Sequence, residues 1–333
     1  MEEKHPRTLI LGWPFWPAQS WLQNNPDVTA ARIYQERLTR SAKRWMNASF
    51  HLPPPLQWME KLHPQHWYGA WKKGLCSYDF VILIDEVRGR DIFEFILQQN
   101  PHCKIVVFYD HAIEPGSMRN PNKYRDLPLV FCTCDRKVAE EYHIAFEPYF
   151  YIFSPYNFST YETMQFSEGK GVFFIGEEKG DRIGRLARIR NCLERNGIAC
   201  DFHLVRKRHG KRYTKQQLAE TCDYLPYNEI LQHIENCQAI LEIISDGQTG
   251  LTQRPYEAMF FHKKLLTTSE EVCRYDFYCP QNVFVLGETM DSEVQAQKLL
   301  EFLQEPVKPF DGWWEYSLTA WVRRLYQRCV SGA

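Results

Sequence analysis

Residues 171–176 read GVFFIG, a short apolar run closed by glycine that predicts a buried strand. Apolar residues at helical spacing follow over 181–195, where Asp181 can cap the helix and Asn196-Gly197 can end it. Further strands are expected at 200–205, 238–244, 264–268 and 282–286, and further helices at 228–236, 254–262 and 293–303. Strands that alternate with helices at about 25–35 residues per unit are typical of a parallel sheet with crossover helices. The pattern predicts a doubly wound α/β domain over residues 170–305.

The first half of the chain has the same pattern in a weaker form. Strands are expected at 8–12, 80–85, 104–109, 127–132 and 146–152, and helices at 30–45, 91–98 and 137–142. Residues 154–169 are polar and aromatic without periodicity, which is typical of a linker. We therefore expect an α/β protein in which the N-terminal domain, 1–153, and the C-terminal domain are two Rossmann-like, doubly wound domains facing a cleft.

Tryptophan is distributed unevenly. Seven of the ten tryptophans lie between Trp13 and Trp71, and the other three are Trp313, Trp314 and Trp321. This split predicts that the C-terminal segment, 306–333, crosses back to the N-terminal domain. An amphipathic helix is expected there over 313–326.

Bulk properties exclude several classes of protein. A formal net charge of -1 argues against a dedicated nucleic-acid binder. No apolar run approaches the roughly 20 residues that span a bilayer, and the first residues do not form a secretory signal. The cysteines are dispersed, and Cys132, Cys192 and Cys237 resemble small core residues of a reducing compartment. We expect a cytoplasmic protein.

Ligands of open α/β sheets bind beyond the carboxyl ends of the strands, so the loops after the strands are candidate sites. Gly247 and Gly250 precede a helix that bears Arg254 and Glu257, and this turn can cradle an anion or be a plain strand-to-helix turn. Lys179 and Arg182 follow the strand at 171–176 on the same rim. Two cations at a helix N-terminus suit a diphosphate, although solvated surface charges would have the same pattern.

Residues 246–259, DGQTGLTQRPYEAM, and 262–268, HKKLLTT, resemble the donor-site segment of retaining GT-B glycosyltransferases of bacterial capsule and lipopolysaccharide (O-antigen) biosynthesis. The resemblance covers about 170–290 and implies the GT-B fold and a nucleotide-sugar donor. It implies ribose binding by Glu257 and diphosphate binding by the backbone of the turn and by basic residues. The implied donor-binding residues are Lys179, Arg182, Gly250, Leu251, Thr252, Arg254 and Glu257. The chain departs from the family at Thr249, where a second Glu is common, and at Glu177, where an Arg is common.

Two polar pairs follow strands of the first half. Asp85-Glu86 follows the strand at 80–84, and Asp110-His111 follows the strand at 104–109. A carboxylate or His at such a point can act as a catalytic base or bind a sugar hydroxyl, while helix caps and turns use the same residues structurally. We take Asp85, Glu86, Asp110 and His111 as the catalytic candidates.

No metal or cofactor is expected. Cys132 and Cys134 have no second pair at zinc spacing, and no Asp-x-Asp motif occurs in the sequence. The basic run 206–212 is either a solvated loop or a contact with an anionic membrane or a lipid-diphosphate acceptor.

The sequence thus predicts a retaining, metal-independent glycosyltransferase of bacterial surface polysaccharide synthesis. It would move a sugar from a nucleotide sugar to a glycan or lipid-linked glycan acceptor, in the cytoplasm and peripheral to the inner membrane. Two alternatives stay open. One is a nucleotide-sugar epimerase of the same architecture, and the other is a non-catalytic carbohydrate-binding or assembly subunit, which the departures at Thr249 and Glu177 would fit.

Overall fold

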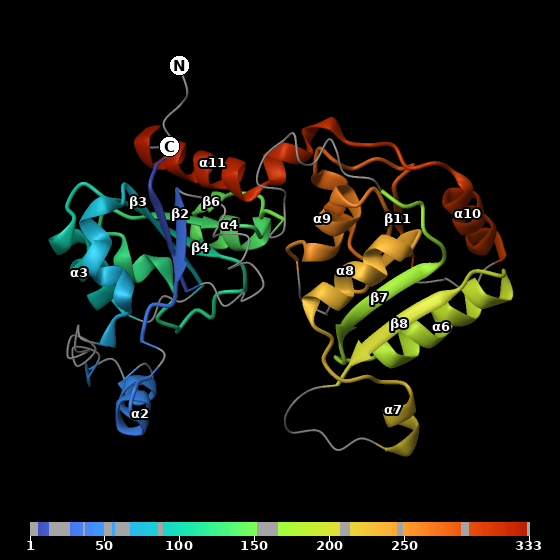
Figure 1. Ribbon diagram of the computed structural model, residues 1–333, viewed down its shortest axis with the longest axis horizontal. Helices are drawn as coiled ribbons and strands as arrows, with labels where there is room; N and C mark the ends of the chain where they lie inside the picture. The colour runs from blue at the N-terminus through green and yellow to red at the C-terminus, as the bar shows by residue number, and fades with distance from the viewer. Residues whose placement is uncertain are drawn as a thin grey trace. The chain divides into compact units, whose positions relative to one another are not determined.

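The computed structural model describes residues 6–12, 27–35, 37–49, 55–56, 67–85, 89–151, 166–206, 214–244, 249–287 and 293–331. The chain divides into two compact units (Figure 1). Unit 1 contains Met1–Tyr156 together with Leu318–Ala333, and unit 2 contains Asn157–Ser317.

Unit 1 is built on a six-stranded sheet in the order β2-β1-β3-β4-β5-β6, in which every neighbouring pair is parallel. The strands are β1 (Thr8–Leu11), β2 (Val28–Ala31), β3 (Phe80–Ile84), β4 (Lys104–Tyr109), β5 (Val130–Thr133) and β6 (Ala145–Phe146). All five residues of β3 are buried, as expected of a central strand covered on both faces.

Helices of unit 1 are α2 (Arg40–Ser49), α3 (Asp91–Gln99), α4 (Arg136–Tyr142) and α11 (Leu318–Ser331), with short 3₁₀ turns η3 (Ala70–Ser77) and η4 (Pro121–Tyr124). The C-terminal α11 packs against β4, where Trp321 is fully buried. Its ring lies 4.9 Å from that of Phe108 and 4.5 Å from that of Phe150. Arg324 on α11 pairs with the buried Glu147 at 2.6 Å. A segment distant in sequence thus completes the core of unit 1.

Unit 2 has a five-stranded parallel sheet in the order β11-β10-β9-β7-β8. Its strands are β7 (Val172–Glu177), β8 (Cys200–Val205), β9 (Ala239–Glu242), β10 (Lys264–Thr267) and β11 (Val283–Val285). Its helices are α6 (Arg182–Arg195), α7 (Lys215–Ala219), α8 (Tyr227–Asn236), α9 (Gln253–Phe260) and α10 (Glu293–Gln304), with η5 (Glu270–Arg274) and η6 (Asp311–Tyr316).

Both sheets have the same doubly wound order. Numbered by their own strands, the second strand lies outside the first, and the third and later strands follow on the other side of the first. The side on which successive strands are added to the sheet reverses between β7 and β9 in unit 2, and between β1 and β3 in unit 1, while all strands stay parallel. In doubly wound folds such a switch point opens a crevice at the carboxyl ends of the two strands. The expectation of an α/β chain with two Rossmann-like parallel sheets is confirmed.

Three expected elements differ from the structure. The helix predicted over 30–45 is wrong at its start, because β2 pairs with β1 and α2 begins only at Arg40. Thr39 Oγ1 accepts the Ala42 N–H at 3.2 Å, which fixes that helix start. The strand expected at 146–152 is reduced to β6, and the helix expected over 313–326 is interrupted at Ser317, whose backbone is extended.

Trp313 and Trp314 belong to unit 2, where Trp313 packs on Phe260 at 5.7 Å. Of the C-terminal tryptophans, Trp321 alone lies in unit 1. Most of the linker expected at 154–169 lies outside the described residues. No disulfide joins any two cysteines, all of which lie among the described residues, and Cys132, Cys134 and Cys237 are buried. Among the described helices, none is both long and apolar enough to cross a membrane.

Candidate functional site

The switch point of unit 2 is occupied by the guanidinium of Arg182. Its Nη1 donates to the Glu177 carbonyl at 2.5 Å, and its Nη2 donates to the Ile243 carbonyl at 2.6 Å. These carbonyls lie at the end of β7 and just after β9. Gly176 leaves room for this side chain, because a Cβ there would lie 3.2 Å from Arg182 Nη1. Burial lowers the pKa of Arg182 from its ordinary value, which nevertheless leaves a cation between the two strands.

A pocket of about 270 Å³ lies at this point. It is lined by Lys179, Gly180, Asp181, Arg182, Arg185, Ile243 and Ile244. The Asp181 side chain forms no capping hydrogen bond to α6 within the described part of the chain, so the first turn of the helix presents backbone N–H groups there. Three cations and a helix N-terminus beside one acid make a pocket suited to an anion.

The cations of the pocket differ in their surroundings. Lys179 is about half exposed, and its ammonium lies 3.8 Å from the Glu177 carboxylate. Asp181 is an exposed acid that lies 3.5 Å from Arg188. The two residues predicted from the first loop, Lys179 and Arg182, therefore line one pocket, which Arg185 joins from the next turn of α6.

The turn before α9 has a different character. Gly247 lies outside the described residues, whereas Gly250 and Leu251 are described. Thr252 Oγ1 caps α9 by accepting the Arg254 N–H at 3.1 Å. The same hydroxyl donates to Glu242 Oε1 at 2.5 Å. A side chain of the protein therefore caps the helix N-terminus of the turn that the sequence offered as an anion cradle.

Glu257 is fully buried. Tyr227 Oη donates to its Oε1 at 2.8 Å, and Arg254 forms an ion pair with its Oε2. Burial raises the pKa of Glu257 above its ordinary value, against the opposing effects of Arg254 and Tyr227. Because the carboxylate is fully buried, a ribose could reach it only after neighbouring groups move aside.

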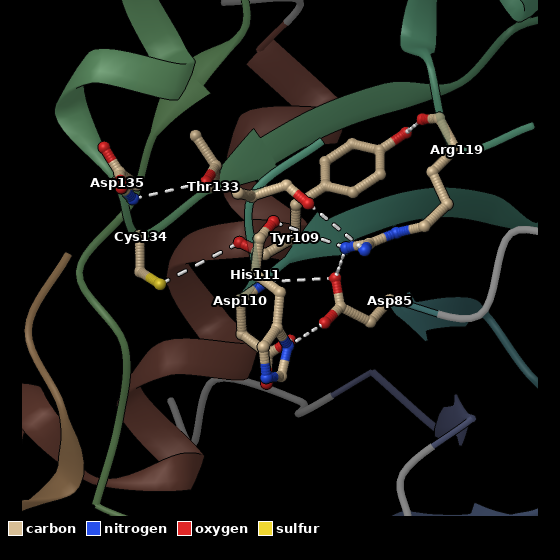
Figure 2. A network of polar contacts seen from close by, with 9 residues as sticks. Asp85, Tyr109, Asp110, His111, Arg119, Thr133, Cys134 and Asp135 are labelled. Carbon is tan, nitrogen blue, oxygen red and sulfur yellow. Dashed lines mark hydrogen bonds and ion pairs between the residues drawn. The ribbon is translucent and has the colours of Figure 1, made fainter. Parts of the chain in front are cut away.

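A second polar cluster lies in unit 1 at the carboxyl ends of β3 and β4 (Figure 2). Asp85 has a φ of 53°, a left-handed conformation that Asp adopts more readily than most residues. Its backbone N–H donates to the Phe108 carbonyl at 2.9 Å, and its carboxylate accepts from Arg119 and contacts His111 Nδ1. Asp110 Oδ1 lies 2.6 Å from the same nitrogen of His111. The structure thus joins Asp85, Asp110 and His111, while Glu86 lies outside the described residues.

The charges of this cluster shift one another's pKa. Hydrogen bonds that His111 donates to Asp110 and Asp85 raise its pKa to about 10, so the ring is an imidazolium at neutral pH. Burial raises the pKa of Asp85 to about 6, although His111 opposes the shift. For Asp110, burial is outweighed by hydrogen bonds from His111 and Asp85, and its pKa falls below the ordinary value. His111 is suited to donate a hydrogen bond or a proton, and Asp85 is the carboxyl closest to the pKa of a general base.

Sequence patterns did not indicate Arg119, Arg185, Tyr227 or Glu242 as site residues. Arg119 lies in an irregular segment, and its carbonyl accepts from Tyr109 Oη at 2.6 Å (Figure 2). Glu242 did leave a signal, because a carboxylate interrupts an otherwise apolar strand. Buried charges of this kind require partners, which Thr252 and Thr267 provide at 2.5 Å each.

No family model matches the chain, and no curated protein matches it by sequence. Three similar solved structures are glycosyltransferases. The lipopolysaccharide outer core galactosyltransferase WaaB in its apo form is 15% identical over 94% of this chain and 86% of its own, with a TM-score of 0.47. AviGT4, involved in avilamycin A biosynthesis, is 12% identical over 98% of this chain and 99% of its own, with a TM-score of 0.47. A glycosyltransferase from Rickettsia africae is 11% identical over 98% and 90%, with a TM-score of 0.49.

Proposed function

We propose that this chain is a glycosyltransferase that binds the diphosphate of a nucleotide sugar in the pocket of Lys179, Arg182 and Arg185. The observation that carries the proposal is the position of this pocket, at the β7/β9 switch point of a doubly wound sheet. That point is where folds of this class bind phosphorylated ligands. A second α/β unit in the same chain offers a surface for the acceptor. The proposal keeps the GT-B class of glycosyltransferase that the sequence resemblance implies.

The chemistry proposed for this pocket is charge stabilisation. As the bond from sugar to diphosphate breaks, negative charge grows on the phosphate oxygens. Lys179, Arg182 and the first N–H groups of α6 stabilise that charge, which lowers the barrier without a metal ion. If the configuration at the sugar is retained, a phosphate oxygen of the leaving group can take the proton of the acceptor hydroxyl.

Donor recognition beyond the phosphates belongs to the segment from Gly250 to Glu257. We propose that the backbone of Gly250, Leu251 and Thr252 lies along the diphosphate and that Glu257 binds the ribose. Arg254 supports this segment, because it pairs with Glu257 and its own N–H bonds Thr252. Ribose binding then requires a local movement that exposes the buried carboxylate of Glu257.

The cluster of unit 1 is proposed to act on the acceptor. Asp85 accepts the proton of a sugar hydroxyl, and His111 donates a hydrogen bond to a neighbouring hydroxyl or anionic group. Asp110 holds His111 in its charged form. Glu86 stays a candidate by sequence. This assignment is independent of the donor pocket, so it can be wrong while the assignment of the donor pocket is right.

The acceptor is proposed to be a glycan or lipid-linked glycan of bacterial surface polysaccharide synthesis, handled by a cytoplasmic enzyme at the inner membrane. Its support is the basic run that begins at Arg206, which suits an anionic lipid surface. Residues 207–212 of this run lie outside the described residues. Binding of the purified chain to vesicles with and without anionic lipid tests this part.

The central experiment is a thermal-shift and calorimetry screen of UDP, GDP, CMP and dTDP sugars with the full chain. We expect one nucleotide class to bind saturably and to bind at least tenfold more weakly in Arg182→Ala. Arg195→Ala, in the last turn of the same helix, is the matched control and should bind as the unaltered chain does. If no nucleotide binds, or both variants lose binding equally, the donor pocket is not at Arg182. Product analysis with donor alone separates transfer from epimerisation.

One observation favours a second candidate, a non-catalytic carbohydrate-binding or assembly subunit. The carboxylate of Glu257 is enclosed by Arg254 and Tyr227 in the absence of ligand. A site that keeps this arrangement could not bind ribose there. Saturable glycan binding without any nucleotide binding would support that function over transfer.

A further inference from the structure

Unit 2 contains a cluster of two histidines and one aspartate that the proposed function does not use. Asp201 and His203 alternate along β8, so they share one face of the strand. Phe202 and Leu204 occupy the other face, where Arg190 of α6 lies 5.2 Å from the Phe202 ring. The face of Asp201 and His203 meets His233, in the last turn of α8.

The three side chains converge through their polar atoms. Asp201 Oδ1 lies 2.7 Å from His203 Nε2, and Asp201 Oδ2 lies 2.6 Å from His233 Nδ1. All the potential ligand atoms lie within 4.8 Å of one another. The two imidazole rings lie 4.6 Å apart at an angle of 60°.

Packing holds these rings in place. The fully buried Phe173 stacks on His233 at 5.3 Å, nearly parallel to it, and lies 5.9 Å from His203. The His203 and His233 side chains are 21% and 32% exposed, whereas Asp201 is 50% exposed. The nitrogen ligands are therefore preorganised, while the carboxylate can move and solvent can reach the cluster.

We propose that Asp201, His203 and His233 bind a zinc ion. Two imidazoles and one carboxylate are a ligand set that zinc prefers, and a water would complete four-coordination. Zinc bonds of roughly 2.0–2.2 Å in a tetrahedron place ligand atoms about 3.3 Å apart. The present separations of 2.6 and 2.7 Å reach that spacing by a small rotation of the exposed carboxylate. The negative end of the α8 dipole adds to the attraction for a cation.

The zinc site lies away from the donor pocket. Asp201 pairs with Phe173, near the start of β7, whereas Arg182 contacts carbonyls beyond the ends of β7 and β9. The ion would therefore fasten the edge strand β8 to α8 and would take no part in sugar transfer. Because it binds the folded unit, it stabilises unit 2 by mass action. The inference does not depend on the proposed function.

Cobalt substitution gives a direct test. The full chain is treated with chelator and titrated with Co²⁺, whose visible absorption reports tetrahedral binding, and Zn²⁺ is then added in competition. We expect one equivalent to bind, Zn²⁺ to displace it, and the melting temperature of the chelated chain to rise with Zn²⁺. His233→Gln and Asp201→Asn should each weaken binding by at least about tenfold. His102→Gln, at an exposed site of unit 1, is the matched control and should leave binding unchanged.

The exposed Asp201 makes Asp201→Asn the variant to rely on if His233→Gln does not fold. Three results would each overturn the proposal. The first is the absence of stoichiometric binding at micromolar metal concentrations. In that case Asp201 would join the two imidazoles by hydrogen bonds alone. The second is equal binding by the chain, Asp201→Asn and His102→Gln. The third is a near-ultraviolet thiolate-to-cobalt band, which would assign the metal to cysteine.

Discussion

Arg182 donates a hydrogen bond to the carbonyl oxygen of Ile243 at 2.6 Å, and so links the loop after β7 to the residue that follows β9. This contact places a cation between the two strands at which the sheet of unit 2 reverses its winding. The same guanidinium donates to the Glu177 carbonyl. The side chain that would hold a diphosphate is thus also a bridge within the fold.

Replacing Arg182 should separate these two roles. Arg182→Lys keeps a cation but cannot donate to both carbonyls in the same fork geometry. We expect it to weaken nucleoside-diphosphate binding about ten- to hundredfold, which corresponds to about 1.5–3 kcal/mol for a charged hydrogen bond. Calorimetry measures the affinity, and urea unfolding shows whether the bridge also contributes to stability. Unchanged affinity in a folded Arg182→Lys would remove the guanidinium from the site.

The Arg254–Glu257 pair should matter more for stability than a surface pair of the same spacing. Glu257→Gln leaves Arg254 without its charged partner in a site where the carboxylate is fully buried. Breaking such a pair costs about 3 kcal/mol or more. Arg274→Gln is the matched control, because the Arg274 side chain is 62% exposed and pairs with Glu271 three residues away at 3.4 Å. Its loss should cost less than about 1 kcal/mol in urea unfolding. Equal losses would contradict the burial of Glu257.

His111 should stay protonated at neutral pH. Its pKa is raised to about 10 by Asp110 and Asp85, whereas burial and Lys263 lower the pKa of His262. Nitrogen NMR of the imidazoles at pH 7.5 should therefore show His111 charged and His262 neutral. Asp110→Asn should return the pKa of His111 toward its ordinary value. A His111 that titrates near its ordinary value in the unaltered chain would contradict the two-carboxylate arrangement.

The same pKa shifts determine how the free energy of unfolding changes with pH. The folded pKa of His111 exceeds its unfolded value of 6.5, so its contribution is complete below about pH 6.5 and is lost as pH rises through 10. Asp85 is also raised, from 3.8 to about 6, so its contribution is lost as pH rises over that range. Asp110 is lowered, and its contribution is lost on acidification below its ordinary value. Comparing unfolding of the chain and of Asp110→Asn from pH 5 to 10 isolates the His111 part.

The alternation of apolar strands and amphipathic helices was sufficient to predict both sheets, because central strands such as β3 are buried on both faces and are mostly apolar. The segment 30–45 failed for a physical reason. Val28 to Ala31 form a strand only because β1 lies beside them, and such pairing is invisible to local propensity. The meeting of Asp85 with Asp110 was predictable, since parallel neighbours end at one edge.

Contacts between distant segments could not be predicted in the same way. Arg119 reaches Asp85 from an irregular segment with no period to place it. Tyr227, at the start of α8, bonds Glu257 of α9 at 2.8 Å, although the two residues are thirty positions apart in the sequence. His233 joins Asp201 and His203 through the packing of α8 on the sheet, which no metal-binding spacing in the sequence encodes.

The C-terminal helix should stabilise one unit and leave the other unaffected. Trp321 is fully buried in unit 1 against Phe108 and Phe150, and Trp321→Ala should cost about 3–5 kcal/mol. Trp313 lies only eight residues earlier but packs on Phe260 in unit 2. Hydrogen exchange read by mass spectrometry should therefore quicken in β3 and β4 for Trp321→Ala, and in β9 and α9 for Trp313→Ala. Each variant is the control for the other, since both remove an indole from the same stretch of sequence. Equal acceleration of exchange in both units for either variant would show that the stabilities of the two units are coupled. That result would contradict the separate cores of the two units and the packing of α11 on β4.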